Sequence, residues 1–214
     1  MYFTSTRNSI FHNKVVQLTL LASVLLGYRV YVSGTTDFLF MFWNLFLAAL
    51  PLLFSRLLLL NYKKGKHRIL SFSILFFWLL FLPNSPYVIT DLIHLDTSIA
   101  TVWVDILMLF IFALSGLLLG ILSMMDVFSF LQKNNHPIIA NLIILGVSLL
   151  SGFGIFLGRF LRFNSWDIIA RPQLLIECIY KSLLLWNAWL WIIGFGAFIW
   201  VSFWALKPYL RGSR

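Results

Sequence analysis

The chain has 214 residues, of which 61% are hydrophobic and only 11% carry a charge. Water-soluble domains carry about 25% charged residues, so this composition excludes an ordinary soluble domain and indicates several membrane-spanning helices. The net charge of +9 does not predict nucleic-acid binding, because the basic residues lie in short runs between apolar blocks, as in loops at an anionic membrane surface. The single cysteine, Cys178, excludes an internal disulfide and a cysteine-based zinc cluster. We expect no metal and no other cofactor.

Six apolar stretches approach the roughly 20 residues that a helix needs to cross a bilayer. They lie at 15–32, 38–60, 68–82, 102–125, 137–158 and 183–206. No segment between them is long enough to bury a core of its own. The sequence therefore predicts one integral membrane domain over residues 1–214, an all-α polytopic bundle of about six transmembrane helices.

The basic residues predict an orientation, because lysine and arginine are enriched in cytoplasmic loops. With both termini inside, most of the 16 basic residues fall on the cytoplasmic side, above all those of "NYKKGKHR" at 61–68, and nearly all acidic residues fall outside. Arg159 and its basic neighbours are the main contrary signal. We expect cytoplasmic N and C termini.

Two small-residue motifs, Gly116-x-x-x-Gly120 and Gly154-x-x-x-Gly158, lie in the fourth and fifth apolar stretches. Glycines at this spacing let helix backbones approach closely. The short "QKNNH" connection makes these two stretches antiparallel neighbours. The motifs predict internal helix packing, with homo-oligomerisation through one of these faces as the alternative.

The stretch "FLPNSPYVITDLIHLD", residues 81–96, follows the third span. Serine is favoured as a helix N-cap and proline at the first helical position, so Ser85 and Pro86 predict a new helix. Tyr87, Asp91 and His94 share one face of that helix, opposite an apolar face. The predicted helix is therefore short and amphipathic, and either lies in the membrane interface or re-enters the bundle.

Asp91 and His94 are the candidate catalytic pair of this stretch. Residues three apart meet on one helix face, and a carboxylate beside an imidazole orients it and raises its basicity, as a general base requires. A zinc site needs three or four ligands, so Asp96, Asp105 or Asp167 would have to converge on the pair. We do not predict a metal site.

A second polar segment, "GRFLRFNSWDIIARPQ" at 158–173, lies between the fifth and sixth spans. Arg159 and Arg162, three residues apart, are the candidate anion-binding residues, because guanidinium groups match phosphate and carboxylate geometry. The alternative is that they contact lipid headgroups or pair with Asp167 and Asp91. We expect Asp105, at the start of the fourth span, to pair with one of these arginines. The supporting residues are Asn84, Tyr87, Thr90, Asp105, Asn164, Trp166 and Asp167.

The two stretches "LFLPNSPYVITDLIHL" and "GRFLRFNSWD" resemble the signature segments of the bacterial membrane-protein family DUF1361, a domain of unknown function. The matching residues are Pro83, Asn84, Pro86, Tyr87, Thr90, Asp91, Leu92, His94, Gly158, Arg159, Arg162, Asn164, Ser165, Trp166 and Asp167. The resemblance implies a multi-pass protein of the bacterial plasma (inner) membrane. It implies no activity.

Three functions remain open at this point. The first is a non-catalytic membrane component, or a lipid- or anion-binding protein, in which the two polar segments brace each other in a closed network; its partners are the bilayer and an anionic lipid headgroup or lipid-linked phosphate. The second is an enzyme acting on a lipid-linked or phosphorylated substrate at the outer interface, which requires a cavity beside His94. A transporter is the least favoured, since ionisable residues lie at span ends and not near mid-membrane.

Overall fold

The computed structural model describes residues 6–65, 68–95 and 102–210, without the side chains of residues 6–12, His94 and Leu210. Most of the described residues are helical, and none of them is in a strand. The elements are α1 (Thr6–Ser33), α2 (Phe40–Lys63), α3 (Arg68–Phe81), α4 (Asn84–Tyr87), the 3-10 helix η1 (Val88–His94), α5 (Val102–Asn134), α6 (Pro137–Leu161), α7 (Asp167–Ala170), α8 (Pro172–Leu183) and α9 (Trp186–Leu210).

The described residues contain six helical segments that are long and apolar enough to cross a membrane, which confirms the predicted fold class. The shortest helix among them, α3, has 14 residues, and its span is completed by α4 and η1, so that this segment runs from Arg68 to Ile93. The longest helix, α5, has 33 residues, or about 50 Å at 1.5 Å per residue. It is the central helix and contacts α1, α2, α4, α6 and α9.

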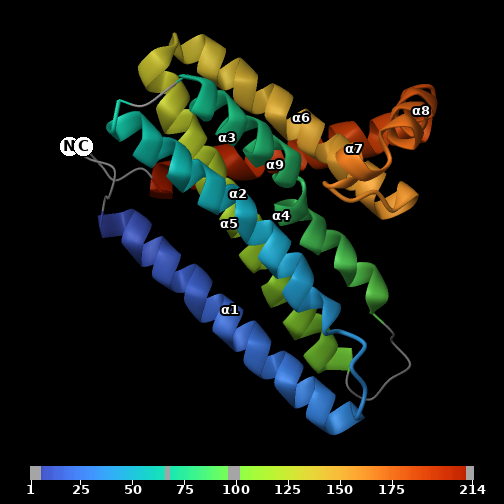
Figure 1. Cartoon of the computed structure of the whole chain (residues 1–214). Coiled ribbons are helices and arrows are strands. Elements are labelled where there is room, and N and C mark those ends of the chain that lie inside the picture. The colour runs from blue at the N-terminus through green and yellow to red at the C-terminus, as the bar shows by residue number, and fades with distance from the viewer. Residues whose placement is uncertain (1–5, 66–67, 96–101, 211–214) are drawn as a thin grey trace.

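The helix that begins the described chain and the helix that ends it share one end of the bundle. The start of α1 and the end of α9 lie together on the left of Figure 1, while α7 and α8 lie at the right. We call the first the terminal end and the other the distal end. An even number of spans returns the chain to the side where it began, as observed.

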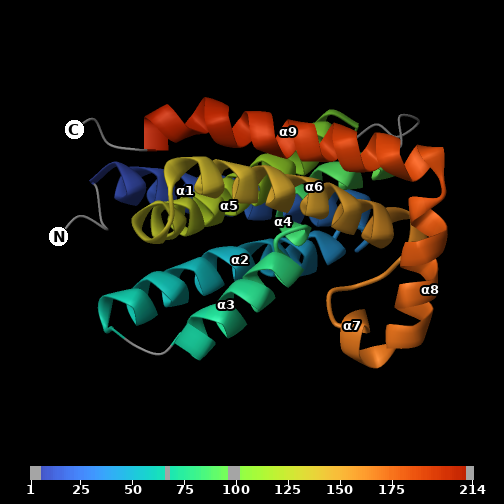
Figure 2. The same cartoon turned by 90° about the horizontal axis from the view of Figure 1, so that it is seen from above.

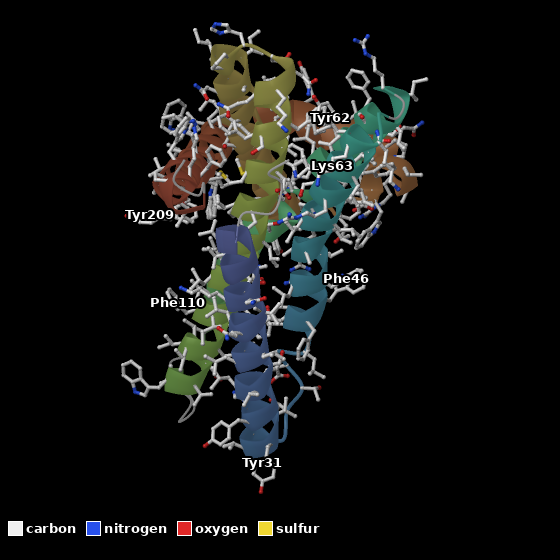
Figure 3. The ribbon with its side chains drawn as sticks, turned by 90° about the vertical axis from the view of Figure 1, so that its left-hand side faces the viewer. Tyr31, Phe46, Tyr62, Lys63, Phe110 and Tyr209 are labelled. Carbon is white, nitrogen blue, oxygen red and sulfur yellow. The ribbon has the colours of Figure 1, made fainter. Side chains whose placement is uncertain are left out.

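The outward surface of the bundle is apolar. Phe46 of α2 and Phe110 of α5 are both exposed and point away from the bundle, whereas Tyr31 and Tyr62 lie at its opposite ends (Figure 3). Large exposed side chains of this kind are unfavourable in water and suit lipid. The arrangement is that of a protein embedded in a bilayer.

The short α4 is wedged between the glycine faces of α5 and α6. A Cβ atom added at Gly116 would lie 2.6 Å from the carbonyl oxygen of Ser85, and one added at Gly154 would lie 2.5 Å from Cγ of Pro83. The second glycine of each motif likewise faces α4, Gly120 beside Ser85 and Gly158 beside the Tyr87 ring. The motifs therefore serve internal packing and are filled from within the chain, so that neither glycine face is open to a second copy.

The segment after α3 lies inside the bundle as the second half of the third span, and not in the interface. Ser85, Pro86 and Val88 are buried, and α4 contacts α2, α5 and α6. The predicted cap is wrong, because Ser85 does not cap α4. Its hydroxyl donates to the carbonyl of Ala48 in α2 at 2.8 Å, which satisfies a polar group that burial would otherwise leave unpaired.

Candidate functional site

The two polar segments meet at their Asn-Ser pairs. Nδ2 of Asn84 donates to Oγ of Ser165 at 3.0 Å, and also to the carbonyl of Phe81 at 2.9 Å. Oγ of Ser165 lies 3.0 Å from the carbonyl of Leu80, to which it donates. Ser165 does not cap a helix either, since α7 begins after Trp166 without a side-chain cap. Both serines instead bind carbonyls of other helices.

Asp91 joins η1 to two other helices. Its Oδ1 lies 3.4 Å from Nη1 of Arg159 in α6, and its Oδ2 accepts a hydrogen bond of 2.8 Å from Nδ2 of Asn44 in α2. The Arg159 guanidinium also lies 6.0 Å from the centre of the Tyr87 ring. The hydroxyl of Thr90 does not donate to Asp91. It donates to the backbone carbonyl of Tyr87 at 2.7 Å.

Asn44 is a member of the site that the sequence analysis missed. The available signal was an amide inside the apolar run "FMFWNLFLAAL", because a polar side chain within a span is costly unless it is paired. The run alone does not show which residue the amide contacts.

Asp105 was expected to pair with Arg159 or Arg162, and this is wrong. Its Oδ1 accepts from Nε of Arg29 in α1 at 2.6 Å, and both side chains are almost fully buried, 5% exposed for Arg29 and 2% for Asp105. The first turn of α5 faces α1, which packs along it, so α1 supplies the cation.

Asp167 pairs within its own segment. Arg171 donates to both of its carboxylate oxygens at 2.9 Å, and the backbone N–H of Asn164 donates to Oδ2 at 2.7 Å. These bonds hold the pKa of Asp167 below its ordinary value, the hydrogen bond from Arg171 being the largest cause. The alternative in which Asp167 pairs with Arg159 or Arg162 is therefore wrong. The contacts of Asp167 hold together the loop between α6 and α8.

A cavity of about 930 Å³ lies beside Asp91, between α2, α3, α6 and α8. Its polar lining consists of Asn44, Asn84, Tyr87, Asp91, Arg159, Arg162, Asn164 and Ser165, and the rest is apolar. Arg162 has a left-handed backbone conformation, with φ of 57°, where it ends α6. Its guanidinium makes no ion pair or hydrogen bond within the described part of the chain.

The other predicted residues fall outside this cavity or outside the described side chains. Trp166 stacks edge-on against Trp43, with ring centres 6.4 Å apart, at the rim of the cavity. Asp105 and Asp167 do not line it. The side chain of His94 and all of Asp96 lie outside the described residues, so the Asp91–His94 pair stays a prediction. Among the described residues, no group of three histidine, cysteine, aspartate or glutamate side chains could hold a metal ion.

These features define a multi-pass helical membrane protein whose third span is broken at α4 and which has a cavity with polar residues at one end. Residues 43–202 match the family described as "Protein of unknown function (DUF1361)", and the chain belongs to that family. The match includes α4, η1 and both Asn-Ser pairs, and excludes all of α1. No curated protein matches the chain, and no solved structure does.

Proposed function

We propose that the protein is a membrane component that binds a phosphate-bearing or similar anionic ligand at the polar end of the cavity. The observation that carries this proposal is Arg162, an exposed residue that lines the cavity and whose guanidinium has no ion pair or hydrogen bond within the described part of the chain. Arginine presents a planar set of donors that matches phosphate oxygens in pairs. A second guanidinium, that of Arg159, lines the same space.

The charge of the described lining favours an anion. Two guanidinium groups, Arg159 and Arg162, face one carboxylate, Asp91, so one positive charge is left over. Arg159 meets Asp91 at 3.4 Å, longer than the 2.7–2.9 Å typical of a strong charged hydrogen bond. This leaves the guanidinium of Arg159 with donors to offer to a ligand as well. The apolar walls strengthen such an interaction by lowering the local dielectric constant.

The arrangement favours binding over bracing alone. A purely structural network would have joined Asp91, Arg159, Arg162 and Asp167 to one another and left no space between them. Instead Asp167 pairs with Arg171, and the cavity lies beside Asp91, Arg159 and Arg162.

An enzyme acting on a lipid-linked or phosphorylated substrate is the second candidate. Its support is that Asp91 lines the same cavity as both arginines, where a carboxylate could orient a base or accept a proton. His94 is the base in this version. Release of phosphate from a phosphorylated lipid by the wild type, lost in His94→Gln, would select this candidate over binding alone.

The orientation is part of the proposal. Lys63 and Lys64 of the α2–α3 turn, Lys133 near the end of α5 and Lys207 near the end of α9 all belong to the terminal end. Cytoplasmic loops are enriched in such residues. The terminal end is then cytoplasmic, and the cavity belongs to the outer half of a bacterial plasma membrane.

Thermal unfolding of the purified protein tests the anion site. A ligand present at 100 times its Kd stabilises the folded state by about 2.7 kcal/mol, so a phosphate-bearing amphiphile should raise the melting temperature and a neutral analogue should not. Arg162→Asn should remove most of this shift. Lys181→Gln, which changes an exposed lysine paired with Glu177, is the control and should retain it. An equal shift in Arg162→Asn and the wild type would refute the site.

A further inference from the structure

We propose that the ligand is a bilayer lipid with a singly charged phosphodiester headgroup, which reaches the cavity sideways from the membrane between α3 and α6. In this arrangement the phosphate lies at Arg159 and Arg162, and an acyl chain lies along the apolar walls. The inference rests on the proposed anion site and adds to it the class of ligand and the route of access.

The walls of the cavity fit a hydrocarbon chain. One wall is the last part of α3, with Phe76, Leu79 and Leu80, and the other is α6, with Leu150, Phe153 and Leu157. Leu150 and Arg159 are nine residues apart on α6, which is about 14 Å along a helix. A lipid whose phosphate lies at Arg159 can therefore place a substantial length of chain against these side chains.

The mouth of the cavity faces the bilayer. Phe76 and Leu150 line the cavity and are also about half exposed, at 52% and 53%. Both lie within membrane spans, so their exposed surface meets hydrocarbon and not water. The opening between them is continuous with the lipid phase.

The helices on the two sides of the mouth are not packed against each other. Among the described elements, α3 packs mainly on α2, whereas α6 packs on α9, α5 and α4. Figure 2 shows α3 and α6 on opposite sides of α4, diverging toward the terminal end. Because α4 holds them apart at one end through Pro83 and Gly154, the space between them is a built feature of the fold.

Apolar side chains of α7 and α8 contribute to the distal end of the cavity, beside Arg162 and Asn164. Ile168 of α7 and Leu175 and Ile179 of α8 complete the lining there, and α7 and α8 lie across this end of the bundle (Figure 2). A lipid already in the outer half of the membrane reaches the cavity without crossing this end.

The charge of the site selects among lipids. One positive charge is left over at the described polar lining, and a phosphodiester without a cationic headgroup supplies one negative charge. The amide side chains of Asn44, Asn84 and Asn164 also line this end and can bind hydroxyl groups of a headgroup. Phosphatidylglycerol combines both properties and is the probe of choice.

Binding of two probes distinguishes a lipid from a soluble anion. Phosphatidylglycerol in nanodiscs otherwise made of phosphatidylcholine carries chains and headgroup, and glycerophosphoglycerol carries the headgroup alone. The wild type should bind the lipid at least about tenfold more tightly, a difference of about 1.4 kcal/mol. Leu150→Trp narrows the mouth and should weaken lipid binding about tenfold while leaving glycerophosphoglycerol binding unchanged.

Matched variants distinguish failure of the proposed sideways access from failure of the proposed anion site. Leu142→Trp, at a residue of α6 that is 62% exposed and does not line the cavity, should change neither affinity, and Arg162→Asn should weaken both. Equal affinity of the wild type for the two probes, or unchanged lipid binding in Leu150→Trp, would overturn sideways access while leaving the anion site in place. Unchanged binding of both probes in Arg162→Asn would overturn the anion site itself. Should Leu150→Trp not fold, Phe76→Trp on the opposite rim gives the same test.

Discussion

Asn84 and Ser165, 81 positions apart in the sequence, are joined by a hydrogen bond of 3.0 Å from the amide to the hydroxyl. The bond ties the end of α3 to the loop that follows α6. That loop carries Arg162 and Asn164 into the lining of the cavity. The contact between the two Asn-Ser pairs therefore positions the residues proposed to bind the anion.

A double-mutant cycle on this contact should give a measurable coupling energy. Asn84→Ala and Ser165→Ala should each lower the free energy of unfolding by roughly 1 kcal/mol, and the double variant should lose less than the sum by about 0.5–1.5 kcal/mol. Chemical unfolding in mild detergent measures all four proteins. Simple additivity of the two single changes would show that the hydrogen bond contributes nothing.

The glycine that faces Pro83 should not tolerate a methyl group. In Gly154→Ala the new Cβ would lie 2.5 Å from the proline ring, so α6 must shift away from α4, at a cost of about 1–3 kcal/mol. Gly146→Ala in the same helix meets nothing within 4 Å and should be neutral or slightly stabilising. Melting temperatures that fall equally in both variants would contradict the packing of α4 described above.

The left-handed backbone conformation of Arg162 should make the folded protein less stable than it would be with glycine at this position. A left-handed conformation costs an L-residue other than glycine about 1–2 kcal/mol, and Arg162 has φ of 57°. Arg162→Gly should therefore raise the melting temperature while abolishing the stabilisation by a phosphate-bearing amphiphile. A variant that loses stability, or that keeps the ligand response, would show that the arginine serves the fold and not the ligand.

Removing one partner of the buried Arg29–Asp105 ion pair should destabilise the fold more than removing both. Asp105→Asn leaves a buried guanidinium without its counter-charge, and we expect a loss of about 3–5 kcal/mol. Replacing both, as Arg29→Met with Asp105→Leu, removes the charges together and should cost much less. The single and the double variant are compared by their yield of folded protein and their free energy of unfolding. An equal loss of stability in both would argue against the pairing.

The loop after α6 should weaken in acid because of Asp167. The pKa of this carboxyl is lowered in the folded state by Arg171 and the Asn164 backbone, so its ionised form stabilises the fold above the ordinary pKa of about 4. That contribution is lost as pH falls from about 4 through the lower folded pKa. The difference in melting temperature between the wild type and Asp167→Asn should thus shrink between pH 6 and pH 3. A difference that is constant with pH would contradict the assignment.

The sequence predicted the helical architecture because it depends on local patterns, whereas it left open whether the two polar segments meet. Apolar runs of bilayer length require helices, and the breaks at Pro83 and Pro86 require a change of direction. The Gly154 motif identifies a face of close approach. Its occupant, α4, follows only from the packing of the whole bundle.

The ion pairs were predicted less well because they depend on how each helix is rotated about its axis. Asp105 lies beside Trp103 near one end of α5, and nothing in that spacing shows that it faces Arg29 and not Arg159. Asn44 was missed for the same reason. Ser85 was assigned as a cap from its local preference, but a carbonyl of α2 was the acceptor available in the folded chain.

The most direct test of the central claim is an experimental structure of the protein purified with its native lipids. The account predicts elongated density between α3 and α6 that ends in a phosphate within hydrogen-bonding distance of Arg162 or Arg159. Closure of the cavity by its own side chains, with Arg162 paired to a carboxylate of the chain and no ligand present, would contradict it.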